Sequence, residues 1–161
     1  YKSNESKLTI HVDASFGIHA DGKSHTGLII KYNDNLILFR SRKQTITTLS
    51  STESELVGLS DSIVYLINTI EIFKELGIQF NSKTIYQDNM STIQMINNEK
   101  STTQRTKHIN SRYFTIKERI KDYKVNIEHL PTKEMTADLL TKPLFGLLFN
   151  KFRNQIMNVN D

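Results

Sequence analysis

Acidic side chains stand near the ends of the predicted elements of this chain. Asp13 lies toward the end of an alternating apolar segment, and Asp88 closes a second such segment. Glu53 and Glu55 lie in the first turns of a long helical pattern, and Asp138 begins a short one. Carboxylates that converge at one edge of a sheet repel one another unless cations neutralise them, and oxygen ligands favour Mg²⁺ or Mn²⁺. Two such ions, about 3.5–4 Å apart, can clamp the attacking water and the leaving oxygen of a phosphodiester.

Each of these carboxylates also has a purely structural interpretation. Asp13 precedes a serine and a glycine and could organise a turn. Asp88 and Asn89 are both favoured caps for a following helix. The two glutamates and Asp138 suit the positive end of a helix dipole. For each carboxylate alone, the structural interpretation is the more common one. A coincidence is much less expected when all four carboxylates lie at the ends of elements that would meet at one edge of the same sheet.

The elements that would position these side chains follow from the hydrophobic pattern. Residues 8–14 alternate between apolar and polar and predict a first strand, and "HTGLIIKY" and "LILFRS" predict two more around a turn at residues 33–35. A helical period then runs from a cap at residues 50–52 to a stop at Gly77. The strand "KTIYQD" follows, and then helices at about 89–97 and 106–123.

The last part of the chain predicts one more strand and two helices. "KVNIEHL" is the fifth strand, and a helix follows at about 136–140. An amphipathic helix at about 145–157 is expected to turn four apolar residues inward: Leu147, Leu148, Phe152 and Ile156.

This order of elements predicts one α/β domain. Strands joined by short connections pair antiparallel, whereas strands joined through helices pair parallel. We therefore expect a five-stranded mixed sheet, three strands antiparallel and then two parallel, with helices on both faces. Residues 1–6 are expected to form a lead-in or linker and residues 7–158 the domain.

The helical pattern also distinguishes the two neighbouring glutamates. At about 100° per residue, the apolar side chains between Leu56 and Phe73 form a stripe centred about 60° from Glu55 and about 100° from Glu53. Glu55 therefore borders the buried face and is predicted to point at the sheet. Glu53 is predicted to support the helix cap with Ser50, three residues before it.

Charge and composition limit the function classes. The 161 residues carry a net charge of +4 and no cysteine, so disulfides and thiolate metal sites are excluded. We expect no membrane span and no secretory signal, because no sufficiently long apolar run stands out. Residues 101–124 hold seven basic and two acidic residues. Such a segment suits a polyanion such as nucleic acid, or it forms a solvated helix face.

Five segments together resemble the ribonuclease H domain of copia-type LTR retrotransposon polyproteins. They are "VDASFG", "LSSTESELVGLS", "YQDNMSTIQMI", "RTKHINSRYFTIKERI" and "HLPTKEMTADLLTKPL", in that family's order. The resemblance implies the ribonuclease H-like fold and the metal-dependent hydrolysis of the RNA strand of RNA–DNA hybrids during reverse transcription. It assigns catalysis and the binding of two Mg²⁺ or Mn²⁺ ions to Asp13, Glu55, Asp88 and Asp138. Water, with its pKa lowered by an ion, would be the nucleophile.

The resemblance also implies contacts with the hybrid. Ser15, Ser51 and Thr52 would approach its minor groove, where 2′-hydroxyls and groove shape are recognised. Asn89 and Ser91 begin a helix whose backbone N–H groups favour phosphate, although ordinary helix capping is an equal alternative. The densest basic group also contains His108 and is expected to contact phosphates: Arg105, Lys107 and Arg112.

Some features depart from the family or leave alternatives open. Many ribonucleases H carry a histidine loop before the last aspartate, whereas His129 here is predicted to be a structural strand residue. The chain could instead be a noncatalytic module that positions hybrid for an adjacent reverse transcriptase, or a DNA-cutting nuclease of the same superfamily. Expected partners are the hybrid and the reverse transcriptase domain of the same polyprotein, with no membrane and no disulfide partner. The expected location is intracellular, in a cytoplasmic virus-like particle or in the nucleus.

Overall fold

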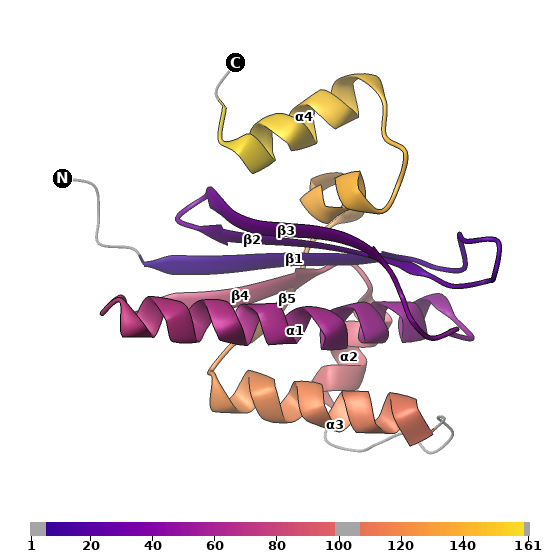
Figure 1. The fold of residues 1–161 in the computed structure, drawn as a ribbon, viewed down its shortest axis with the longest axis horizontal. Coiled ribbons are helices and arrows are strands. Elements are labelled where there is room, and N and C mark those ends of the chain that lie inside the picture. Colours follow the sequence, from indigo (N-terminus) through magenta and orange to yellow (C-terminus); the bar gives the residue numbers. More distant parts are fainter. Residues whose placement is uncertain (1–5, 99–106, 160–161) are drawn as a thin grey trace.

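A five-stranded mixed sheet forms the centre of the molecule, with helices on both of its faces (Figure 1). The computed structural model describes residues 6–98 and 107–159, and the strand order is β3-β2-β1-β4-β5. β1 pairs antiparallel with β2 and parallel with β4, β2 pairs antiparallel with β3, and β4 pairs parallel with β5. The predicted strand arrangement is therefore confirmed. The strands are β1 (Lys7–Ser15), β2 (His25–Tyr32), β3 (Asn35–Lys43), β4 (Ser82–Gln87) and β5 (Asn126–His129).

Two groups of helices cover the two faces of the sheet (Figure 1). One group lies on the face of the main core: α1 (Ser51–Glu75), α2 (Met90–Asn97) and α3 (Lys107–Asp122). The other face carries α4 (Gly146–Met157), which packs on the 3₁₀ helix η2 (Thr136–Leu140). A second short 3₁₀ helix, η1 (Thr132–Glu134), precedes η2. The predicted helix at 136–140 is thus a tighter 3₁₀ turn, and most of the predicted lead-in lies outside the described residues.

Helix α1 packs its apolar stripe against the core-facing side of the sheet. Ser50 caps its start by accepting a hydrogen bond from the Glu53 backbone N–H, and Gly77 ends it at a φ of +76°. The stripe packs against the inward side chains of β1. The buried residues are Leu56, Leu59, Ile63, Leu66, Ile70, Leu8, Ile10 and Val12, whereas Ile67 and Phe73 of the predicted stripe are half-buried. By length and composition alone α1 could cross a membrane, although we expected no such run. Half of its apolar window is buried in this fold, and one helix of this kind is weak evidence for a membrane span.

The inward face of α4 is only partly as predicted. Phe152 and Ile156 are buried, whereas Leu147 is 89% exposed and Leu148 is also exposed. Leu147 lies about 140° around the helix from Phe152, so the two side chains cannot face the sheet together. The prediction is therefore wrong for both leucines, although the angular argument applies to Leu147 alone: Leu148 lies only about 40° from Phe152 and is nevertheless 40% exposed in the first turn.

The face of the sheet under α4 contains buried polar side chains. The Lys31 ammonium donates to the Gln155 carbonyl of α4 at 2.5 Å, which ties this helix to the sheet. His11 lies beside Tyr86, with ring centroids 5.1 Å apart. Burial, and then the charges of Lys31 and Lys7, lower the pKa of His11 to about 4. The ring is therefore held neutral in the folded protein.

His11 should make stability fall on mild acidification. The unfolded chain binds the His11 proton at its ordinary pKa of 6.5 and the folded chain only near 4, so the unfolded state holds more protons between these values. The stability contribution is complete above pH 6.5 and is lost as the pH falls through the window, by up to about 1.4 kcal/mol per pH unit. Urea unfolding at pH 7, 6 and 5 should show this slope in the wild type, and His11→Gln should reduce it. Parallel curves for the two proteins would contradict the assignment.

Candidate active site

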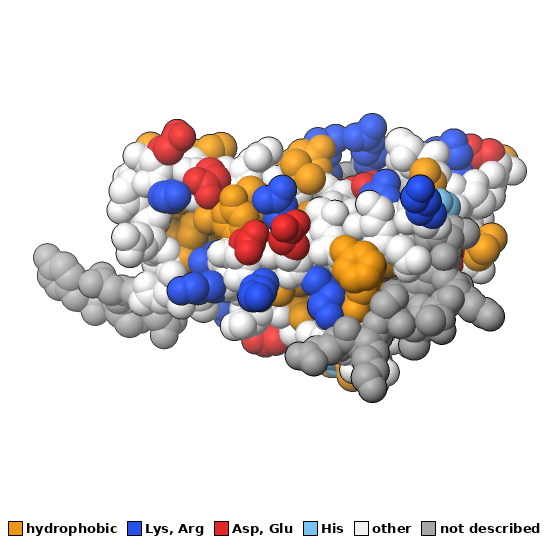
Figure 2. All heavy atoms as spheres, turned by 90° about the horizontal axis from the view of Figure 1, so that it is seen from below, with side chains coloured by type: hydrophobic (Ala, Val, Ile, Leu, Met, Phe, Trp, Pro, Cys, Tyr) orange, Lys and Arg blue, Asp and Glu red, His pale blue; other side chains and the backbone are white. Residues whose placement is uncertain are grey.

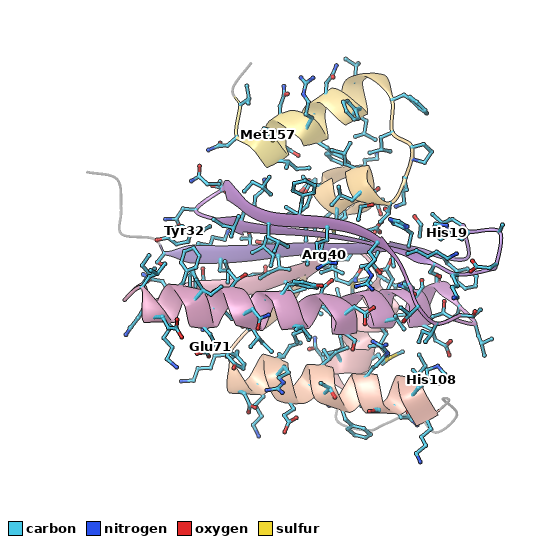
Figure 3. All side chains as sticks on the ribbon, viewed as in Figure 1. His19, Tyr32, Arg40, Glu71, His108 and Met157 are labelled. Carbon is cyan, nitrogen blue, oxygen red and sulfur yellow. The ribbon has the colours of Figure 1, made fainter. Side chains whose placement is uncertain are left out.

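Three acidic side chains from separate elements meet at one end of the sheet. Asp13 lies near the end of β1, Asp88 follows β4, and Glu55 lies in the second turn of α1. Because β1 and β4 are parallel neighbours, their carboxyl ends lie together, and the start of α1 adjoins them. Carboxylate oxygens of the three residues lie within 4.8 Å of one another. The β1–β2 connection with His19 lies at the same end of the molecule (Figure 3).

Glu55 and Glu53 point in different directions. Glu55 is 4% exposed; its Oε1 accepts from the Ala14 backbone N–H and its Oε2 from Gln87 Nε2, each at 3.1 Å. Glu53 turns back to the cap, where its Oε2 accepts from the Leu49 backbone N–H at 2.8 Å. This geometry agrees with the helical-wheel prediction: the Glu53 backbone N–H bonds the Ser50 cap, while its carboxylate bonds Leu49, the residue before the cap.

Asp138 joins the cluster from the opposite face of the sheet, through η2. The Lys142 ammonium lies 2.8 Å from Asp138 Oδ1 and 3.7 Å from Asp13 Oδ1, so one lysine bridges the two carboxylates. The Thr141 hydroxyl donates to the other oxygen of Asp13. The segment after Asp138 therefore positions both Asp13 and Asp138.

Three of these carboxyl groups, those of Glu55, Asp13 and Asp138, resist ionisation. Burial, and then the nearby charges of Asp13 and Asp88, raise the pKa of Glu55 well above its ordinary value. Burial also raises the pKa of Asp13, although Thr141 and Lys142 oppose this rise. For Asp138, burial outweighs the hydrogen bond from Lys142 and brings the pKa to about 6. A cation among these oxygens would offset the cost of charging them, and their chemistry fits a hard divalent ion.

Sequence reasoning missed four polar residues that organise the cluster: Gln87, Thr132, Thr141 and Lys142. Gln87 lies two residues after the buried Ile85 on β4, so a polar residue in a core-facing position was the available signal. Its amide group donates to Glu55 and accepts from the Asn89 backbone N–H. For Lys142 the signal was its place four residues after Asp138. Thr132, whose hydroxyl donates to Asp88 Oδ2 at 2.9 Å, has no comparable sequence signal.

The predicted substrate residues occupy different environments. Ser51 and Ser91 are exposed at the starts of α1 and α2, and Thr52 is half-buried. Asn89 caps α2 through the Thr92 backbone N–H. The two helix starts are linked, because the Thr92 hydroxyl donates to the Thr52 carbonyl at 3.5 Å. Their contact with substrate stays a prediction.

The remaining predicted residues lie apart from these helix starts. Ser15 is buried and donates to the Thr141 carbonyl at 3.1 Å, which gives it a structural partner. Arg112 turns toward α1 and pairs with Asp61 at 2.5 Å. Lys107 is exposed at the start of α3, and Arg105 lies outside the described residues. Arg112 therefore does not share one open face with Lys107, although their contacts with substrate remain untested.

Lys142 should compete with a metal ion for the carboxylates that it bridges. Although burial opposes it, the hydrogen bond to Asp138 and the charges of Asp13 and Asp138 raise the pKa of Lys142, so the side chain stays charged. We expect Lys142→Met to lower the free energy of unfolding in chelator by about 1 kcal/mol, since the lysine is partly exposed. The same variant should bind Mn²⁺ several-fold more tightly by titration calorimetry.

A matched control is Lys121→Met, which removes an equal charge from an exposed position on α3. It should change neither the unfolding free energy in chelator nor the affinity for Mn²⁺. Weaker Mn²⁺ binding by Lys142→Met alone would mean that the lysine assists the ion instead of competing with it.

The chain is similar in sequence to transposon polyproteins and in fold to RNase H domains. No family model matches the sequence. The chain is 30% identical over 150 residues to the Ty1-ER2 transposon Gag-Pol polyprotein of Saccharomyces cerevisiae, a match that covers 91% of the chain and 8% of the polyprotein. The N-terminal RNase H domain of a Mycobacterium tuberculosis protein has the same fold, with a TM-score of 0.61, 14% identity and coverage of 93% of this chain and 98% of that one.

A viral enzyme contains a similar domain. A foamy viral protease–reverse transcriptase in complex with an RNA/DNA hybrid matches with a TM-score of 0.57 and 14% identity, over 80% of this chain and 18% of that one. These structural likenesses confirm the predicted fold class.

Proposed function

Because this chain is a ribonuclease H-fold domain related to the Gag-Pol polyproteins of copia-type retrotransposons, we propose that it cleaves the RNA strand of RNA–DNA hybrids. The observation that carries the proposal is the cluster of Asp13, Glu55 and Asp88, whose oxygens lie within 4.8 Å of one another at the end of the sheet. Carboxylates this close, two of them buried and the third half-buried, repel one another and need cations. Two divalent ions with one phosphodiester would meet that need.

The residues fit two Mg²⁺ or Mn²⁺ ions. Asp13, Glu55 and Asp88 would hold one ion, and Asp13 with Asp138 would hold the other. All these ligand atoms are carboxylate oxygens, which is the donor set that hard divalent ions prefer. When bound, the ions would supply charge stabilisation at phosphorus and lower the pKa of water.

The surrounding residues keep the ligands in place. Ala14 and Gln87 fix both oxygens of Glu55, and Thr132 fixes Asp88. The Thr141 hydroxyl orients Asp13 from the η2 side. Outer hydrogen bonds of this kind set the direction in which a ligating carboxylate presents its free lone pairs.

Hybrid recognition would use the adjoining starts of α1 and α2. Ser51 and Thr52 offer hydroxyls beside Glu55, and Asn89 and Ser91 begin α2 directly after Asp88. Hydroxyls and free helix N–H groups suit 2′-hydroxyl and phosphate groups, respectively. Ser15, Lys107, Arg105 and Arg112 stay candidate contacts of the same proposal.

The polyprotein relationship supports a context for this activity. The chain matches only 8% of the length of the Ty1-ER2 polyprotein, so the functions of the remaining length are not assigned to it. We propose that the partner is the reverse transcriptase of the same polyprotein. The proposed location is a cytoplasmic virus-like particle, with the nucleus as the alternative.

A cleavage assay tests the proposal against its alternatives. Matched RNA–DNA, RNA–RNA and DNA–DNA duplexes should be incubated with the protein in Mg²⁺, in Mn²⁺ and in chelator. We expect cleavage of the RNA strand of the hybrid only, and only with metal. A folded protein that binds hybrid without cutting it would support the noncatalytic module instead, and cleavage of the DNA duplex would support the DNA-cutting nuclease.

A further inference from the structure

A groove lies along the flank of α1, between β3 and α3, and none of the cluster's carboxylates lines it. It has a volume of about 630 Å³, and its floor is the face of α1 that carries Val64 and Asn68. Strand β3 lines one side of the groove with Arg40 and Arg42, and α3 lines the other side with Arg112 and Arg119. Arg40 lies between the sheet and α1 (Figure 3). Three elements far apart in the sequence therefore build one groove.

The groove is strongly cationic. Five basic side chains line it, and Asp61 is its acidic lining residue. Arg112 is occupied by Asp61, and Lys43 by Asp21. The guanidinium groups of Arg42 on β3 and Arg119 on α3 have no hydrogen bond or ion pair within residues 6–98 and 107–159. Figure 2 views the α3 side of the molecule and shows Lys and Arg side chains spread across it, with acidic side chains between them. Two free guanidinium groups facing one groove favour carboxylate or phosphate ligands.

The lining of the groove favours a polypeptide over a nucleic acid. Its floor includes aliphatic side chains, of which Val64 is half exposed. One face of Tyr65, the aromatic ring in the lining, is already covered by the Arg40 guanidinium, 4.4 Å from the ring centroid, which limits the surface that the ring offers for stacking on a base.

The strand beside the groove is the edge of the sheet. β3 is the outermost strand in the order, so one row of its backbone groups faces outward without a neighbouring strand in the described sheet. An added strand would place alternate side chains on the two faces. On the groove face they would meet Arg40 and Arg42, and on the other face they would meet Ile37 and Phe39, which are 44% and 61% exposed.

We propose that an extended polypeptide segment with alternating acidic and apolar residues docks along β3, with its carboxylates in the arginine groove. The apolar residues of the segment cover Ile37 and Phe39, while the acidic ones pair with Arg42 and Arg119. Backbone hydrogen bonds to the β3 edge supply affinity, and the two faces set the sequence preference. This interaction lies outside the proposed cleavage reaction, because none of its residues belongs to the carboxylate cluster.

An unbiased selection tests the docking surface. A display library of random eight-residue peptides should be selected against the folded protein, and the selected peptides synthesised and measured by titration calorimetry. We expect alternating acidic and apolar residues to be enriched, and we expect R42E/R119E to bind those peptides at least tenfold more weakly. The charge-matched control K74E/K121E changes two basic residues outside the groove and should bind as the wild type does.

A second variant tests the apolar face of β3 separately from the arginine groove, and a folding measurement accompanies every variant. Phe39→Ser should weaken the same peptides by removing the apolar contact while leaving every arginine in place. Circular dichroism confirms that each variant is folded before its affinity is interpreted. The proposal is overturned by selected peptides without acidic enrichment or by equal binding to R42E/R119E. It is also overturned if a single-stranded dT₈ oligonucleotide binds through Arg42 and Arg119 while acidic peptides do not.

Discussion

Glu55→Gln is expected to lower hybrid cleavage by at least about 100-fold, because even the outer partners of metal ligands cost about 10- to 100-fold when removed. Glu53→Gln is expected to retain most of the activity. The two glutamates are two residues apart, yet Glu55 meets Ala14 and Gln87 in the buried cluster, whereas Glu53 meets Leu49 at the cap. Initial rates on one hybrid at saturating Mg²⁺ measure the difference.

The stability of the same two variants should show the opposite order. Glu55→Gln removes a buried carboxylate that Asp13 and Asp88 repel, so in chelator its melting temperature should stay equal or rise. Glu53→Gln weakens the cap of α1 and should cost about 1 kcal/mol, the usual cost of a lost cap interaction. Equal losses of activity from the two substitutions would defeat the assignment of Glu55 as a ligand.

The predictions that succeeded rest on periodicity. The alternation that starts at Leu8 fixes which side chains of β1 face α1. It therefore also places Asp13 on the opposite face of the strand. The helical stripe that starts at Leu56 fixes the orientation of Glu55 in the same way. These features depend on residues close in the sequence, so one sequence suffices to derive them.

The features that were missed depend on contacts across the chain. Thr141 and Lys142 reach Asp13 over a separation of more than 100 residues, through a 3₁₀ helix whose packing no local pattern predicts. Arg112 was assigned to an exposed basic face because its spacing suggested one, but Asp61 draws it to α1. The close approach of another segment to Gly27 was also missed, although a glycine inside a strand often marks such an approach.

Gly27→Ala is expected to cost about 100-fold in activity, although residue 27 carries no reacting group, because a misplacement of about 1 Å can cost that much. Gly27 pairs with Asp13 in the β1–β2 ladder. A Cβ at this position would lie 2.8 Å from the Ala137 carbonyl oxygen and 2.9 Å from Thr141 Cγ2, so η2 would have to move. Asp138 moves with η2 and leaves its place beside Asp13. Cleavage rates and Mn²⁺ titration calorimetry measure the effect.

Gly58→Ala is the matched control for this close approach. Its Cβ would meet Thr26 Oγ1 at 3.2 Å, a contact that a shift of a few tenths of an ångström relieves, whereas the 2.8 Å approach of a Gly27 Cβ to the Ala137 backbone oxygen requires a larger shift. Alanine also favours the helix by up to about 1 kcal/mol, so this variant should keep both activity and stability. Gly27→Ala should in addition lose about 1–3 kcal/mol of stability through overpacking. If Gly27→Ala cleaved hybrid and bound Mn²⁺ like the wild type, the position of η2 would not limit the reaction, and Asp138 would lose its proposed place among the ligands.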